Sequence, residues 1–145
     1  MNGTELIYSG RAAGSHFRGG AVQQLCLPDD TEYLPETLGP GTITGYSVIF
    51  ATEYEFGGNI RLPHSNLQNH NVPCAVCHVS TRTSVLMIPA KTQCPLSWTR
   101  EYYGYLTIGV HFRQKFECVD SSPEAVPGSN STNFNSALII YASAI

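Results

Sequence analysis

The sequence predicts an all-β, disulfide-bonded domain. Short runs of β-branched and aromatic residues alternate with Gly, Pro and Asn, the residues that separate strands. The 13 Gly and 9 Pro leave no window of about 12 residues, the mean helix length, with clean helical periodicity. With 145 residues, 42% of them hydrophobic, the chain is sized for one core, so we expect a single domain over residues 1–145.

Each expected strand is a short apolar or aromatic run that is bounded by turn-forming residues. In chain order the expected strands are Glu5–Tyr8, Ala21–Leu27, Thr42–Ala51, Ala75–Val79, Ser84–Ile88, Glu101–Leu106, Gly109–Phe112, Lys115–Val119 and Ala137–Ala142. Two stretches that are rich in Pro and polar residues are expected to be loops, and these are Pro28–Pro40 and Glu124–Asn135.

A weak internal repeat relates residues 5–32 to residues 101–124. Both segments contain a Tyr and a Gly, then Gly-x-His-Phe-Arg, a short strand, a Cys and an acidic loop. The matched positions include Gly14–Arg18 with Gly109–Arg113, and Cys26 with Cys118. We interpret the repeat as two related β-units that pack as a pseudo-symmetric pair.

The composition favours an extracellular protein. Only 13% of the residues are charged, about half the usual share, and the net charge is −3 without a basic run. Phosphate binding needs clustered positive charge, so we expect no nucleic-acid partner. No apolar run approaches about 18 residues, so we expect no membrane insertion. The start, MNGTELIYSG, lacks the signal-peptide pattern, and we expect either a signal removed earlier or another export route.

Five cysteines are the main chemical feature. One C-x-x-C lies at Cys74 and Cys77, close to His70 and His78. A zinc site needs four ligands, usually from two close pairs, and here only one such pair exists. A redox dithiol needs a helix N-terminus to lower its pKa, whereas the following HVSTRTSVLMI is strand-like. Disulfides are therefore favoured over both alternatives.

The pairing of the cysteines stays open between two schemes. Cys94 with Cys118 would close a hairpin-like unit, and an odd cysteine would stay free or link two chains. Cys26 is the first candidate for that odd cysteine, because the repeat gives it no mate. A bond from Cys26 to Cys74 or Cys77 is the competing scheme.

Three segments carry a resemblance to a known family. CPLSWTREYYGYL (Cys94–Leu106) resembles the C-P-x-x-W-x-x-x-Y-x-G-Y pattern of the non-collagenous domains of type IV collagen. IYSGRAAGSHFRGGAVQQLCLPDD and HNVPCAVCHVSTRTSVLMIPAKTQCP are similar to the C-terminal domains of short-chain, spongin-type collagens and related secreted proteins of marine invertebrates. The resemblance covers roughly Thr4 to Tyr141. It implies an all-β extracellular domain with two related halves, and a disulfide knot at the C-x-x-C.

The departures from that family bear on function. The chain has no Gly-X-Y repeat, so it is not itself a collagen, and it lacks a first and a C-terminal cysteine of the pattern. Small members of this kind without a collagen part include galactose-binding lectins. The resemblance therefore implies carbohydrate binding for a stand-alone domain.

One segment is dense in the side chains that bind sugars. Sugar sites combine an aromatic face with planar hydrogen-bonding groups, and binding groups tend to lie on loops. The candidates, which share the run Glu53–Cys74 with Gln68, are Glu53, Tyr54, Glu55, Asn59, Arg61, His64, Asn66, Asn69, His70 and Asn71. The structural alternative is a polar loop that bonds its own backbone. For the repeated His16 and His111, and for Trp98, a structural role is favoured.

Calcium and catalysis are the remaining alternatives. No cofactor is required by the sequence, but a Ca²⁺ site is open at the acidic loop or at Glu53 and Glu55. The acidic loop offers Asp29, Asp30 and Glu32, with Asp120 and Glu124 as partial counterparts. No hydrolase or phosphate-loop motif occurs, and carboxylates two residues apart are not the opposed pair of a glycosidase. We therefore expect no enzyme.

The sequence thus predicts a secreted, non-catalytic lectin for galactose-type glycans or glycoproteins. A single shallow sugar site binds weakly, so we expect a homo-oligomer that gains avidity. The alternative is an extracellular-matrix assembly module that resembles the collagen non-collagenous domains, and a small enzyme ranks third.

Overall fold

The computed structural model confirms the all-β fold class. It describes residues 3–15, 23–32, 49–57, 63–109, 115–134 and 137–142. The described strands are β1 (Thr4–Ser15), β2 (Leu25–Pro28), β3 (Ile49–Tyr54), β4 (Pro73–Val79), β5 (Gly104–Gly109), β6 (Phe116–Asp120) and β7 (Ala137–Tyr141), with one short 3-10 turn, η2 (Ser65–Leu67). The described part of the chain holds no apolar helix of the length that a bilayer requires.

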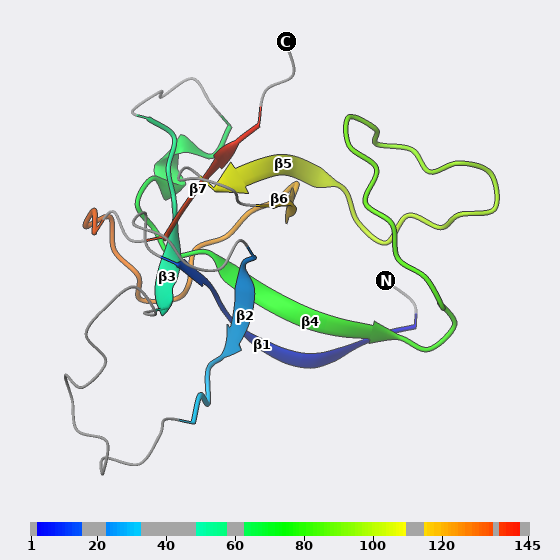
Figure 1. Cartoon of the computed structure of the whole chain (residues 1–145), viewed down its shortest axis with the longest axis horizontal. Helices are drawn as coiled ribbons and strands as arrows, with labels where there is room; N and C mark the ends of the chain where they lie inside the picture. Colours follow the sequence, from blue (N-terminus) through cyan, green and yellow to red (C-terminus); the bar gives the residue numbers. More distant parts are fainter. Residues whose placement is uncertain are drawn as a thin grey trace.

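The strands form one curled sheet (Figure 1). Their order is β2-β1-β3-β7-β5-β6, and β4 pairs with β1 outside this path. All pairings are antiparallel except that between β3 and β7, which runs in parallel from Thr52↔Ala137 to Tyr54↔Ile139. The parallel pair joins a first unit, made of β1 to β4, to a second unit, made of β5 to β7.

The two units share the register of their strands. In the first unit Gly10 lies opposite Pro28, and in the second Gly104 lies opposite Asp120. Three residues after each glycine, both β1 and β5 begin an antiparallel pairing with their inner neighbour, β3 or β7. From either edge of the sheet, an edge strand (β2 or β6) is followed by a strand that begins with such a glycine register (β1 or β5) and then by an inner strand (β3 or β7). The packing of the units as a pseudo-symmetric pair stays a prediction.

Two glycines permit this shared register. A Cβ atom on Gly10 would lie 1.8 Å from the Leu27 carbonyl oxygen, and one on Gly104 would lie 1.8 Å from that of Val119. Both contacts are to backbone, so no side chain can move aside to make room. Only glycine permits this close approach of the strands without a backbone shift.

The core lies where β3 and β7 meet the turn around η2. The buried cluster is Tyr54, Phe56, Leu67, Val72 and Ile139. The Tyr54 and Phe56 rings stack with their centroids 6.0 Å apart. Ala12 and Tyr141 pack partly buried against the cluster, so both units contribute to one core.

Most strand predictions are confirmed within the described residues, with shifted ends. The first expected strand is longer than predicted, and those at Glu101–Leu106 and Lys115–Val119 begin later. Asp29–Glu32 and residues 124–134 are loop, as predicted. Parts of Ala21–Leu27, Thr42–Ala51 and Gly109–Phe112 lie outside the described residues, as do His16 and His111.

The prediction of a strand at Ser84–Ile88 is wrong. These residues form no strand and belong to a lobe, residues 80–103, that extends from the end of β4 to the start of β5 (Figure 1). Val85 in this run is 94% exposed. An apolar run becomes a strand only where a neighbouring edge can pair with it, and the sequence does not reveal whether one exists.

The structure also decides between the two cysteine schemes. Cys26 and Cys74 form a disulfide that links β2 to β4 across a sequence separation of 48 residues. Cys77, Cys94 and Cys118 are free thiols. The expected Cys94–Cys118 bond is therefore absent, and Cys26 is not the odd cysteine. The competing scheme is confirmed for Cys26 with Cys74.

Candidate functional site

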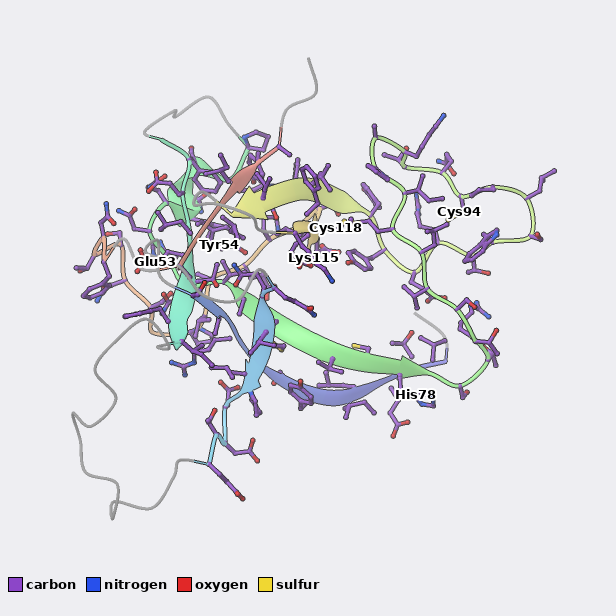
Figure 2. All side chains as sticks on the ribbon, in the orientation of Figure 1. Glu53, Tyr54, His78, Cys94, Lys115 and Cys118 are labelled. Carbon is purple, nitrogen blue, oxygen red and sulfur yellow. A yellow bond between two sulfur atoms is a disulfide. The ribbon has the colours of Figure 1, made fainter. Side chains whose placement is uncertain are left out.

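The first two predicted sugar ligands lie in the core. Glu53 and Tyr54, on β3, are each only 2% exposed (Figure 2). The Tyr54 hydroxyl donates to the Glu124 carbonyl oxygen at 3.0 Å, and burial raises the pKa of this phenol. Both side chains are buried and do not reach a surface ligand. The packing around a central strand, and not the polarity of its residues, decides which of its side chains are buried.

A tight turn carries most of the other candidates. After residues 58–62, where Asn59 and Arg61 lie outside the described residues, the chain turns at His64 and again at Asn69. Both have left-handed backbones, with φ of 60° and 65°. Leu67, 8% exposed, anchors the turn in the core. Of the polar side chains on the turn, Asn66 is exposed, while those of His64, Gln68, Asn69 and His70 are half-buried.

Gln68 organises the polar side of this turn. Its Nε2 donates to Glu55 Oε1 at 2.9 Å and to Asn69 Oδ1 at 2.7 Å. Its Oε1 accepts from the Phe56 backbone N–H at 2.7 Å. Glu55 Oε1 also accepts from the Gly57 backbone N–H at 2.8 Å. Asn69 Nδ2 in turn donates to the Ser131 carbonyl oxygen at 3.1 Å, so the network fixes the side chains of Glu55, Gln68 and Asn69.

The other candidates on the turn have different environments. Asn66 is exposed on η2. His70 is half-buried, and its Nδ1 lies 3.1 Å from the Gln68 carbonyl oxygen. Asn71 accepts at its backbone oxygen from Val126 N–H at 3.0 Å and forms an isolated bridge with Glu53. The side-chain bond to the loop's own backbone that was predicted as the structural alternative therefore occurs at His70, while the Asn71 contacts are made by its backbone.

An aromatic cluster of His64, Tyr105 and Tyr141 lies beside the turn. The His64 ring meets the Tyr105 ring edge to face at 5.7 Å, and Tyr105 lies 4.9 Å from Tyr141. The Tyr141 hydroxyl donates to the Pro63 carbonyl oxygen at 3.0 Å, and the ring lies 5.2 Å from Phe56. Burial raises the pKa of Tyr141. All three members of the cluster are half-buried, so they continue the core to the surface.

Sequence reasoning missed the two tyrosines of this cluster. Tyr105 is on β5 and Tyr141 on β7, far along the chain from His64. No local pattern relates these positions, because the antiparallel pairing of β5 with β7 and the parallel pairing of β7 with β3 bring them together. A planar half-exposed ring beside amide and carboxylate groups can pack against a sugar ring and bond its hydroxyls.

The acidic loop does not form a metal site in the described residues. Asp29 lies 3.8 Å from Arg11 in an exposed ion pair, and Asp120 Oδ1 accepts from the Ser122 backbone N–H at 2.9 Å. No group of three or more His, Cys, Asp or Glu side chains within the described ranges could hold a metal ion. His78 Nδ1 lies 3.7 Å from Glu5 Oε2, and both side chains are exposed. Within the described residues, His78 therefore does not form a metal site with the C-x-x-C cysteines.

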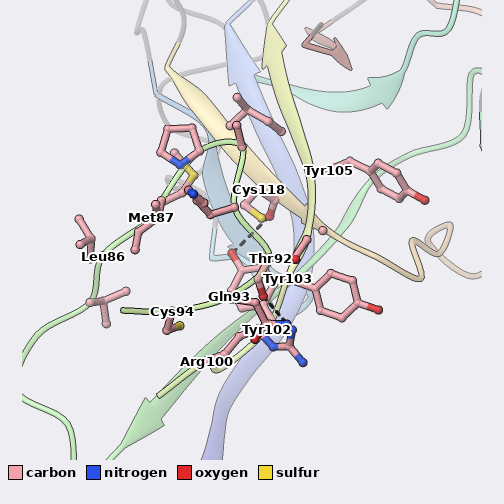
Figure 3. Close-up of a pocket in the computed structure, with 17 residues that line it drawn as sticks. Leu86, Met87, Thr92, Gln93, Cys94, Arg100, Tyr102, Tyr103, Tyr105 and Cys118 are labelled. Atoms are coloured by element: carbon pink, nitrogen blue, oxygen red, sulfur yellow. Dashed lines mark hydrogen bonds between the residues drawn. The ribbon is translucent and has the colours of Figure 1, made fainter. Parts of the chain in front are cut away.

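A groove of about 340 Å³ forms a second feature of the surface (Figure 3). One side is residues 85–94 of the lobe, and the other is Arg100, residues 102–106 and Cys118. Arg100 Nη1 donates to the Thr92 carbonyl oxygen at 2.8 Å, and its guanidinium lies 4.7 Å from the centre of the Tyr103 ring. Cys94 and Cys118 both line this groove.

Comparison with known proteins adds no assignment to these features. No model of a known protein family matches the chain, and no solved structure matches it either.

Proposed function

We propose that this chain is an extracellular, non-catalytic carbohydrate-binding protein for galactose-type glycans. The observation that supports it best is the aromatic cluster of His64, Tyr105 and Tyr141 beside the turn that Gln68 organises. The resemblance of the sequence to spongin-type collagen domains, and its more distant resemblance to galactose-binding lectins, support the same proposal.

The proposed binding mode combines stacking with hydrogen bonds. The axial hydroxyl of galactose leaves one ring face lined by neighbouring C–H groups, which packs against the exposed part of Tyr105. Glu55 and Asn69, fixed by Gln68, accept and donate at the hydroxyls, and the exposed Asn66 adds a planar amide. Buried Glu53 and Tyr54 support the site from below.

A pair of matched variants tests this site. Tyr105→Ala should weaken retention on immobilised galactose about tenfold, the equivalent of ~1.4 kcal/mol of lost stacking. Tyr103→Ala removes a tyrosine that is 46% exposed in the groove and should leave retention unchanged. Asn66→Ala, at an exposed position, should weaken retention without altering the circular dichroism spectrum. Equal retention of all three variants and the parent would contradict the proposed site.

A second candidate function has its own supporting observation. Residues 80–103 carry exposed large apolar side chains, with Val85 at 94% and Leu96 at 96%, and with Leu86, Met87, Trp98, Tyr102 and Tyr103. Exposed apolar surface of this kind is typical of protein-binding regions. It favours a matrix assembly module that works through protein contacts. Self-association that no simple sugar reverses, together with no retention on any glycan, would support this candidate over the lectin.

A further inference from the structure

The two units have equivalent contacts around their cysteines. The Tyr8 hydroxyl donates to the Cys26 carbonyl oxygen at 3.2 Å. The Tyr102 hydroxyl donates to the Cys118 carbonyl oxygen at 3.3 Å. In each unit the tyrosine stands two residues before the close-contact glycine, and the cysteine stands opposite the second residue after that glycine. Cys118 is therefore the structural counterpart of Cys26.

The first unit has one more strand than the second. β4 pairs with residues 4–11 of β1, places Cys74 opposite Gly10 and supplies the sulfur that bonds Cys26. In the second unit the corresponding residues, 98–103, pair with no strand among the described residues, and Cys118 is a free thiol. The groove of Figure 3 lies between this unpaired segment and residues 85–94 of the lobe, and Cys118 lines it.

The groove is suited to an added strand. Its lobe side offers Leu86 and Met87, which are 59% and 42% exposed, and its other side offers the half-exposed Tyr102. Extended segments bind such sites by adding a strand to a sheet edge, with apolar pockets taking alternate side chains. A strand bound in the groove would pair with the second unit and place a sulfur near Cys118, as β4 pairs with β1 and bonds Cys26 in the first unit.

We propose that the occupant is β4 of a second copy of this chain, and that its Cys77 forms a disulfide with Cys118. β4 pairs with β1 along one edge, and its other edge is unpaired within the described residues, so it can add to a second sheet. Cys77 is the exposed thiol of the three free ones.

Exposed apolar residues next to Cys77 fit the same occupant. Leu6 lies opposite Cys77 in the β1–β4 ladder and is 59% exposed, and its neighbour Ile7 is 55% exposed. The outer part of this ribbon has only two strands, which is marginal in water without further packing. Burial against the groove of a second copy would cover both apolar surfaces at once.

The bond forms by thiol–disulfide exchange with a small-molecule disulfide such as oxidised glutathione. The Cys77 thiolate attacks that disulfide, forms a mixed disulfide and releases one glutathione thiolate. Cys118 of the second copy then loses its proton, attacks the Cys77 sulfur and releases the second glutathione thiolate. Two protein thiols are oxidised and one glutathione disulfide is reduced to two thiols. Burial raises the pKa of Cys118, which is consistent with the exposed Cys77 reacting first.

A two-fold axis makes the contact reciprocal. Each copy donates its β4 edge and accepts that of the other, so two Cys77–Cys118 bonds close a dimer. Cys94 stays free in each copy. If the proposed function holds, this assembly would present two sugar sites for avidity. Tyr105 also lines the groove, so dimerisation and galactose retention are measured separately.

The experiment incubates the full chain in a buffer of oxidised and reduced glutathione and measures its mass by non-reducing electrophoresis and sedimentation. We expect a reducible dimer and a peptide that joins Cys77 to Cys118 in mass spectrometry. Cys77→Ser and Cys118→Ser should each be monomeric, whereas the matched control Cys94→Ser should stay dimeric. Leu86→Asp, at an exposed groove position, should lower the dimer fraction about tenfold at fixed concentration.

Two results would overturn the proposal. The first is a monomer whose Cys118 joins Cys94 in the same chain, since both thiols line the groove. The second is a monomer with Cys77 and Cys118 both open to alkylation after oxidation. Retention on galactose by either monomer would leave the proposed function intact, so the two proposals fail separately.

Discussion

Gly10 and Gly104 are the residues on which the shape of each unit depends most directly. Each allows a carbonyl oxygen of the neighbouring strand to lie where a Cβ atom would otherwise be. Gly14 offers a contrast, because its Cβ would meet the flexible Gln24 side chain at 2.9 Å. The type of neighbouring atom, backbone or side-chain end, thus decides which glycine can be replaced.

Gly104→Ala should therefore destabilise the protein by about 1–3 kcal/mol or more, the cost of overpacking against a backbone that must shift. Gly14→Ala should cost clearly less, since Gln24 can move. Urea unfolding of both variants measures the free energies. Equal losses of unfolding free energy in the two variants would show that the backbone contact at Gly104 does not exclude a Cβ atom.

Tyr102 gives a prediction about pH. Burial, followed by the neighbouring Cys118, Glu117 and Asp120, raises the pKa of Tyr102 to about 12. A phenol that ionises at higher pH when folded than when unfolded, near pH 10, adds stability that is complete below pH 10 and is lost as pH rises toward 12. The free energy of unfolding should therefore fall over pH 10–12, and Tyr102→Phe should reduce that fall. A pH profile identical to that of the parent would contradict this assignment.

At the scale of the elements, β4 is fixed by a covalent link. The Cys26–Cys74 disulfide ties it to β2, so that β1 is held between two joined neighbours. In the chain-entropy model, a closed loop of 48 residues stabilises the fold by about 4 kcal/mol.

Cys74→Ser should accordingly lower the free energy of unfolding by about 2–4 kcal/mol. The double variant Cys26→Ser/Cys74→Ser should lose no more than either single variant, because all three lack the same bond. Thermal and urea unfolding at matched concentration measure these values. A double variant that loses the sum of two single losses would mean that the sulfurs act separately.

The turn around η2 is the element that links stability to the candidate site. Gln68→Ala removes hydrogen bonds to Glu55, Asn69 and the Phe56 backbone. It leaves the Phe56 N–H without this acceptor, so we expect a loss of about 1–3 kcal/mol in unfolding free energy and weaker galactose retention. Gln68→Glu keeps the acceptor for Phe56 and should recover stability in part but not retention, because it cannot donate to Glu55. Unfolding and retention measured on the same samples separate the two effects.

The strands show what could be predicted locally. β4 and β7 were predictable because β-branched and aromatic residues lie between turn formers there. Ser84–Ile88 has the same local character but no partner strand, and pairing is a property of the whole sheet. The same limit applies to the predicted sugar ligands. Glu53 and Glu55 have the same side chain and similar neighbours in the sequence, yet the first is buried and the second is half-buried at the turn.

At the scale of the whole molecule, the arrangement of the two units in one sheet underlies both proposals. The parallel junction of β3 and β7 brings Tyr105 and Tyr141 beside His64, which builds the candidate sugar site. The strand that the second unit lacks leaves the groove with the free Cys118. The sequence matched Cys26 with Cys118, but which cysteine is bonded depended on which strands pair in the folded sheet.

Binding to a glycan array, run with calcium and again with a chelator, tests the central claim of carbohydrate binding most directly. We predict selective binding to terminal-galactose glycans that the chelator leaves unchanged, since the described residues hold no metal cluster. Binding that the chelator abolishes would contradict the metal-free site at Tyr105. A blank array from folded, oligomeric protein would contradict the lectin proposal altogether and favour the matrix assembly module.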